Sequence, residues 1–209
     1  MKKIIIMMML ALVPMMILAQ DNNEERDSIR SNTKYGELFF RKGIFVKYED
    51  FRIEKYQYTG YGNLFKIKTS IRKLYGQTKS YYFLKLRIGN SVVFIEYSDL
   101  VEINKALAKL MTEVASDCLK QPEYLRNKFI TDDEFEIGYW IEKKSNKYLP
   151  TWYFDFDRFN RHWKLYSVEI DIEKVSKMFQ EKQAQIEEMM ASDLCHGDRR
   201  LTRYTDVRC

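Results

Sequence analysis

The sequence predicts an α+β fold: an antiparallel sheet of six to eight strands with two helices. Short segments rich in Phe, Tyr, Ile and Val, which favour strands, alternate with turn signals. Two longer segments place apolar residues three and four positions apart, which is typical of an amphipathic helix. The order strand-strand-strand-helix occurs twice, so we expect two duplicated halves, about 36–120 and 121–192.

The first half begins with segments rich in aromatic and β-branched residues. Those with a strand pattern are residues 38–48, 51–58, 64–74, 79–88 and 92–97. Gly60-Tyr61-Gly62-Asn63 predicts a turn, and Gly89-Asn90-Ser91 predicts a hairpin between the last two segments.

A helix should close the first half. Ser98 or Asp99 is suited to cap it, because either side chain accepts a hydrogen bond from the free N–H groups of the first turn. The apolar positions form one stripe: Leu100, Ile103, Leu107, Leu110, Met111 and Val114. We expect the helix to end near Cys118, ahead of Pro122.

The second half repeats this order. Residues 135–142 alternate apolar and polar side chains, as a half-buried strand does, and residues 152–157 and 162–170 predict two more strands. Asp171 is expected to cap a long helix that runs to about Met190. Its apolar stripe contains one polar residue, Lys182.

The two halves match residue by residue at several places. The matching pairs are Phe65 with Phe135, Ile67 with Ile137, Ile71 with Ile141, Tyr82 with Tyr153, Asp99 with Asp171, and Lys105 with Lys177. Their offsets grow from 70 to 72 residues, as small changes in loop length would produce. The alternative is that any two such units need similar residue types. Under duplication, we expect the halves to join edge to edge into one sheet with both helices on one face.

The N-terminus has the layout of a secretory signal peptide, residues 1–19. Two lysines precede an uncharged run of sixteen residues, 4–19, which contains Pro14 and ends at Ala19. A membrane span needs about 20 apolar residues, so we expect cleavage after Ala19, with an uncleaved anchor as the alternative. Residues 20–35 then form a flexible leader, residues 36–192 a single domain, and residues 193–209 a basic tail.

Composition narrows the partners and the compartment. Removal of Lys2 and Lys3 lowers the formal net charge from +5 to +3, which gives no reason to expect a nucleic-acid partner. We expect a periplasmic or extracellular protein with no stable membrane span after cleavage. An oxidising compartment favours one disulfide, and we predict Cys195–Cys209, with Cys118–Cys195 as the competing pairing.

The sequence contains few patterns typical of catalysis. Asp155 and Asp157 lie two positions apart on a predicted strand and therefore share a face, with His162 just beyond. These residues are the candidate acid/base site of a cell-envelope hydrolase; the simpler interpretation is a solvated strand face. The two histidines, His162 and His196, lack the spacing of a zinc site, and we expect no metal and no cofactor.

The abundant tyrosines favour a binding protein instead. Exposed Tyr rings provide amphipathic contact area at low entropic cost. The candidate binding residues are Tyr56, Tyr58, Tyr81, Tyr153 and Tyr166. We therefore expect a non-enzymatic, exported protein-binding domain, in the manner of an inhibitor or immunity protein, whose partner is an unknown protein or envelope component. The hydrolase remains the alternative.

Overall fold

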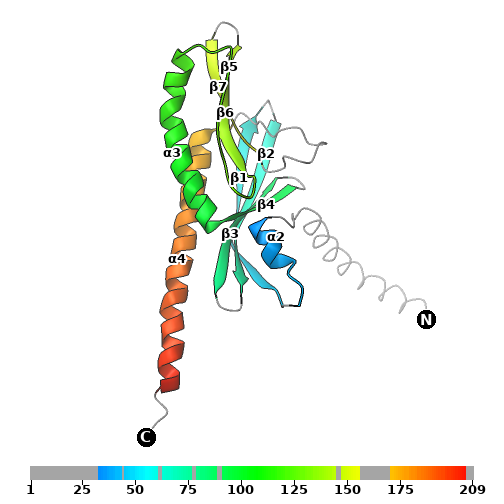
Figure 1. Ribbon diagram of the computed structural model, residues 1–209, viewed down its shortest axis with the longest axis vertical. Coiled ribbons are helices and arrows are strands. Elements are labelled where there is room, and N and C mark those ends of the chain that lie inside the picture. The colour runs from blue at the N-terminus through cyan, green and yellow to red at the C-terminus, as the bar shows by residue number, and fades with distance from the viewer. Residues whose placement is uncertain are drawn as a thin grey trace, which may run out of the picture.

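The computed structural model describes residues 33–43, 45–60, 63–76, 79–88, 91–144, 147–155 and 170–205. These residues form an α+β fold with two antiparallel sheets, of four and three strands, and three helices (Figure 1). The expected single sheet is therefore wrong: in the described residues the halves form separate sheets. They are joined through their helices rather than edge to edge.

The four-stranded sheet, sheet A, is a meander in sequence order. Its strands are β1 (Lys47–Gly60), β2 (Asn63–Tyr75), β3 (Ser80–Ile88) and β4 (Ser91–Glu96). The segments 51–58 and 38–48 were expected to be two strands. Residues 47–60 instead form one strand, in which a bulge between Phe51 and Glu54, with Arg52 at φ 51°, shifts the register.

The beginning of the expected first strand is a helix, α2 (Lys34–Phe39). The Thr33 side chain caps it by accepting a hydrogen bond from the Gly36 N–H at 3.0 Å. Tyr35 and Phe39, four positions apart, share one side of the helix, and their rings stack with centroids 5.4 Å apart. The predicted strand missed this because four-residue spacing over one and a half turns is too short to show a helical period.

The three-stranded sheet, sheet B, consists of β5 (Tyr124–Ile130), β6 (Glu136–Lys144) and β7 (Lys147–Asp155). Strand β5 was not predicted, because polar Asn127 lies between Leu125 and Phe129 on its inner face and weakens the alternation. Strands β5 and β6 approach closely at Gly138, where a Cβ atom would lie 2.2 Å from the Asn127 carbonyl oxygen.

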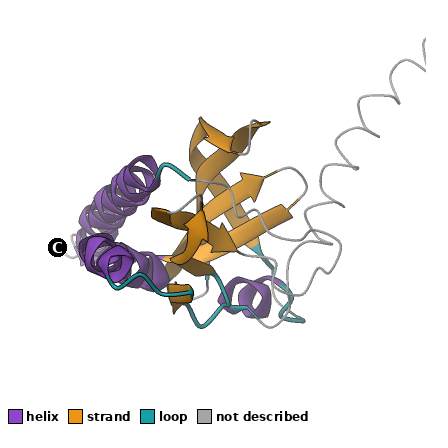
Figure 2. Ribbon diagram, turned by 90° about the horizontal axis from the view of Figure 1, so that it is seen from above, coloured by secondary structure: helices purple, strands orange, loops and turns teal. Residues whose placement is uncertain are grey.

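Helices α3 (Tyr97–Leu119) and α4 (Ile172–Thr205) form a layer on one side of both sheets (Figure 2). One hydrophobic core joins them: Ile71 and Leu84 of sheet A, Ile137 of sheet B, Leu107 of α3 and Phe179 of α4 all belong to it. The helix stripes that the sequence predicted face this core. The shared helix layer explains how two separate sheets form one body.

The two helices begin differently. Asp171 accepts a hydrogen bond from the Lys174 N–H at 3.3 Å, as a capping residue does. The predicted cap of α3 is wrong, because that helix begins at Tyr97 and its first turn contains Asp99. The Asp99 carboxylate instead accepts a hydrogen bond from the Lys34 ammonium group at 2.8 Å, which ties α2 to the body.

Helix α4 continues to Thr205, well past the expected end near Met190, so much of the expected irregular tail is helical (Figure 1). Asp193 holds this part against sheet A through the Lys73 ammonium group, 2.5 Å away, and through the Tyr82 hydroxyl. Figure 1 also shows the end of α4 extending beyond the strands.

Lys182, the polar residue in the stripe of α4, is fully buried. Its ammonium group donates to the Glu54 carboxylate at 2.8 Å, to the Gln185 side-chain oxygen at 3.1 Å and to the Arg52 carbonyl at 3.1 Å. The bulge in β1 therefore presents a carbonyl to the one cation in the helix stripe. A buried ammonium group with three acceptors is satisfied, as burial requires.

Several predicted features lie outside the described residues: the signal peptide, nearly all of the leader, and the third strand of the second half. No helix within the described part of the chain combines the length and apolar character needed to cross a membrane.

Candidate functional site

The most distinctive surface is the outer face of sheet B, which points away from the helices. Strand register places twelve residues on it in four cross-strand rows, because residues paired across antiparallel strands share a face. The rows are Tyr124/Glu142/Leu149, Arg126/Trp140/Thr151, Lys128/Gly138/Tyr153 and Ile130/Glu136/Asp155. The end with Glu136 and Lys128 is mainly polar, and at the other, mainly apolar end Tyr124 and Leu149 flank Glu142, which pairs with Lys144.

A buried carboxylate organises the polar end. Glu136 is only 4% exposed, and Arg126 and Lys128 donate to its two oxygens at 2.6 and 2.8 Å. The Tyr153 hydroxyl donates to the oxygen that Arg126 also contacts, at 2.5 Å, and accepts from the Arg126 Nε–H at 2.7 Å. Each polar group of this cluster therefore has a partner.

The charges of this cluster are fixed. Burial acts to raise the pKa of Glu136, but its hydrogen bonds with Lys128 and Tyr153 and the nearby guanidinium outweigh burial, so the pKa lies below its usual range. Burial, reinforced by the bond to Glu136, raises the pKa of the Tyr153 hydroxyl. At neutral pH the cluster is thus one anion, two cations and a neutral phenol, and the Asp155 carboxylate, paired with Glu136 in the ladder, balances the second cation.

The apolar end is open to solvent. Tyr124 is 62% and Leu149 48% exposed, and they share one row of the face. Trp140, half-buried in the next row, leans toward Tyr153, with ring centroids 5.2 Å apart. Large exposed apolar side chains that share a surface with Trp and Arg are typical of protein-binding sites. No local sequence pattern predicts this cluster, because the three residues come from three strands, one of them not predicted.

The outer face of sheet A differs, because α2 covers part of it. The Tyr35 ring stacks on Phe94 at 3.7 Å and meets Phe83 edge-on at 5.1 Å. Beneath the helix, the buried Arg72 guanidinium donates to both Asp50 oxygens, at 2.6 and 2.8 Å, and to the Tyr35 hydroxyl at 2.8 Å. This cluster is a covered ion pair that anchors α2.

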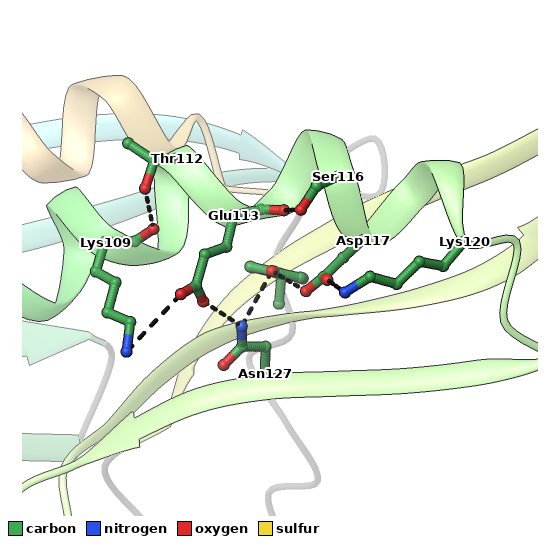
Figure 3. Close-up of polar contacts among 8 residues, drawn as sticks. Lys109, Thr112, Glu113, Ser116, Asp117, Lys120 and Asn127 are labelled. Atoms are coloured by element: carbon green, nitrogen blue, oxygen red, sulfur yellow. Dashed lines mark hydrogen bonds and ion pairs between the residues drawn. The ribbon is translucent and has the colours of Figure 1, made fainter.

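A second polar network lies on the inner side of sheet B, against α3 (Figure 3). The Tyr139 hydroxyl donates to Asp117 at 2.7 Å and accepts from the Asn127 amide at 3.1 Å. That amide also donates to Glu113 at 3.0 Å, and Lys120 donates to Asp117 at 2.6 Å. The Lys120 bond, followed by the Tyr139 bond, lowers the pKa of Asp117. The network fixes the end of α3 on the sheet.

The predicted binding tyrosines do not form one patch. Tyr56 lies on the helix side of sheet A, where its hydroxyl donates to Glu54 at 2.6 Å. Tyr81 is on the other side of that sheet, against the α2 cluster, and Tyr153 is buried in sheet B. Tyr58 lies in β1, but its side chain is outside the described residues, as is all of Tyr166.

Of the predicted hydrolase residues, Asp155 alone lies in the described part of the chain. It ends β7 and pairs with Glu136 in the β-ladder, so two carboxylates share the polar end of the outer face of sheet B. Asp157 and His162 lie outside the described residues. Within the described ranges, no group of three or more acidic, His or Cys residues is placed to hold a metal ion.

The cysteine prediction is not tested. Cys118 is a half-buried free thiol on α3. Cys195 lies in α4, but its side chain and the whole of Cys209 are outside the described residues. No disulfide forms among the side chains that the structure describes, and the Cys195–Cys209 pairing stays a prediction.

Comparison with known proteins adds no relative. No family model matches the chain, no curated protein matches it, and no solved structure matches its fold.

Proposed function

We propose that this chain is an exported, non-enzymatic protein-binding domain whose contact surface is the outer face of sheet B. The observation that supports the proposal most directly is the open apolar end formed by Tyr124, Trp140 and Leu149. A Tyr and a Leu that are about half exposed on one flat face lose contact with water when a partner covers them.

The polar end supplies rigidity and charge. Because Glu136 engages both cations and the Tyr153 hydroxyl, Arg126 is held beside Trp140 in a defined orientation. A positioned guanidinium next to aromatic rings contacts a partner at a lower cost in side-chain entropy than a mobile one. The Arg126 and Lys128 side chains, 38% and 30% exposed, can also pair with acidic groups of a partner.

The first test compares the capture of a partner protein from envelope extract by three immobilised forms of the chain. Each form starts at Gln20 and therefore contains every described residue. The wild type is immobilised beside Y124S/L149S and beside the control I53S/L119S, which replaces two side chains that are 56% and 83% exposed elsewhere. We expect the wild type and the control to capture the same protein from envelope extract and Y124S/L149S to lose it. Capture unchanged by Y124S/L149S would refute the surface.

We propose export from the uncharged run that precedes the polar residues from Asp21 onward. Mass spectrometry of the protein isolated from cells should give a mass that begins at or near Gln20. A chain that retains Met1 and is recovered from cytosol would contradict export and the envelope partner together.

The alternative function is a cell-envelope hydrolase, and the pairing of Asp155 with Glu136 favours it. Against it, the Glu136 oxygens already accept three hydrogen bonds, and the pKa of Glu136 is lowered, so this carboxylate is a poor proton donor near neutral pH. D155N should leave partner capture unchanged. Loss of a measured hydrolytic activity in D155N would establish the enzyme instead.

We also infer that the two halves arose by duplication. In support, Ile67 and Ile71 of β2 and Ile137 and Ile141 of β6 are all buried against the shared helix layer. The matched Tyr82 and Tyr153 count against it, because Tyr82 faces the helices and Tyr153 lies on the outer face of sheet B. Related sequences that keep the same residue types at these positions in both halves would support duplication, and independent variation of the halves would count against it.

A further inference from the structure

We propose a second binding site, separate from the protein-binding face: the connection between α2 and β1 is an anchor for anionic membrane surfaces. It has the two components of a peripheral membrane contact, exposed aromatic rings and uncompensated cations.

The aromatic component is Phe40 and Phe45, which lie on either side of a turn. Phe45 is fully exposed, at 104%, and Phe40 is 41% exposed, although other aromatic residues of this region pack inward. Phe39, for example, contacts the core cluster beneath α2. An exposed Phe ring is costly in water but favourable at the boundary between lipid headgroups and acyl chains.

The cationic component lies between the two rings. Arg41 and Lys42 are exposed, and they precede Gly43, whose φ of 79° is typical of a turn. A third basic residue nearby, Lys47, is paired with Glu49 at 3.1 Å, so the uncompensated cations of the turn are Arg41 and Lys42. Each cation near an anionic membrane strengthens binding by about fivefold, equal to about 1 kcal/mol.

The same side of sheet A supplies longer-range attraction. Lys55 and Lys68 pair across β1 and β2 on the outer face, the face that α2 packs on, and Lys66 lies two residues from Lys68 on that face. All three are exposed, and within the described residues none of them forms an ion pair. Like charges opposite each other weaken a sheet, and an anionic surface relieves that repulsion.

The composition of the segment favours a lipid surface. Exposed Phe rings on either side of two exposed cations match the boundary between acyl chains and anionic headgroups.

The test is sedimentation of the chain starting at Gln20 with vesicles of phosphatidylcholine, with or without phosphatidylglycerol. We expect binding to the anionic vesicles alone, reduced at least about tenfold by F45S and by R41E/K42E. The control K105E/K177E makes the same change of charge at two exposed helix lysines and should bind like the wild type. All these side chains are exposed, so thermal midpoints should stay close to that of the wild type.

The depth to which the residue at position 45 enters the lipid is measured with F45W. Brominated lipids should quench the tryptophan emission of F45W but not that of the control I53W. Absence of binding to anionic vesicles would overturn the proposal. So would equal loss in K105E/K177E, or quenching of I53W but not of F45W. Retention on immobilised polyglutamate without vesicle binding would also overturn it, in favour of an acidic protein partner.

Discussion

The outer faces of the two sheets each contain a cluster around one buried charged residue, and these central charges have opposite signs. Sheet A buries a cation, Arg72, which shares the Asp50 carboxylate with Lys85, and α2 packs over Arg72. Sheet B buries an anion, Glu136, which two cations neutralise, and the Arg126 and Lys128 side chains remain 38% and 30% exposed. The first cluster is closed, while the second presents charge to solvent.

This difference distinguishes a structural cluster from a candidate contact surface. A covered ion pair leaves no group for a partner, whereas half-exposed cations beside Tyr124, Trp140 and Leu149 do. It also predicts unequal responses to removal of the two carboxylates, because only exposed cations are rehydrated when their partner is lost.

The largest effect is expected for D50N. The Asn side chain leaves Arg72, whose side chain is 2% exposed, without its carboxylate, so the free energy of unfolding should fall by about 3 kcal/mol. Urea denaturation measures the loss. E49Q, a neighbouring change at an exposed carboxylate, serves as the control, and a D50N midpoint as close to wild type as that of E49Q would refute the closed-cluster interpretation.

G138A should be nearly as costly, at about 2–3 kcal/mol, because the new methyl group overlaps the Asn127 carbonyl oxygen and separates β5 from β6. Hydrogen exchange should show loss of protection along β5. The comparison is G43A, which has a positive φ but open space around the Cβ position and should lose about 1 kcal/mol. Unchanged protection in G138A would contradict the close approach.

E136Q should cost less than D50N, about 2 kcal/mol, because Arg126 and Lys128 reach water. Because the folded pKa of Glu136 lies below 4.5, its contribution is present above about pH 4.5 and is lost as pH falls through the folded pKa. The difference in the free energy of unfolding between wild type and E136Q, measured by urea denaturation, should therefore become smaller in acid. A gap that widens in acid would contradict the ion pairs.

D133N should stabilise the fold at pH 7, in contrast to the preceding variants. Burial, followed by the nearby Asp99, raises the pKa of Asp133, although the Lys34 N–H donates to it at 3.0 Å. An ionised carboxyl with a raised folded pKa opposes folding above that pKa, so D133N should raise the thermal midpoint slightly at pH 7 and match wild type in acid. A lower midpoint at pH 7 would show that the charge stabilises α2 instead.

The smallest effect on stability, within about 0.5 kcal/mol, is expected for Y124S/L149S, since both side chains are exposed. The same variant should lose partner binding. A large loss of stability would mean that these residues pack rather than bind.

The sequence predicted those elements that are long enough for their hydrophobic residues to repeat at a regular spacing. The stripe of α3, the hairpin at β3 and β4, and the core positions Ile137 and Ile141 follow from local spacing. Helix α2 is too short to show a period, and β5 interrupts its own pattern with Asn127, whose partners Glu113 and Tyr139 are distant in sequence.

The candidate site was harder to predict than the fold. The sequence indicates Tyr153 through its ring but not through its bond to Glu136, and Tyr124 and Leu149 share a row only through the register of three strands. Register depends on the whole sheet, so no local pattern predicts that row. Lys182 interrupts the apolar stripe of α4, and the structure explains it by the Arg52 carbonyl that the bulge of β1 presents to its ammonium group.

The most direct measurement is site-specific photo-crosslinking in intact cells, with a photoreactive residue at Tyr124, Leu149, Ile53 or Leu119. The four positions are all exposed, but only the first two lie on the outer face of sheet B. We predict the same protein adduct at Tyr124 and Leu149 and none at Ile53 or Leu119. Adducts at Ile53 or Leu119, with none on the outer face of sheet B, would contradict the proposed binding surface.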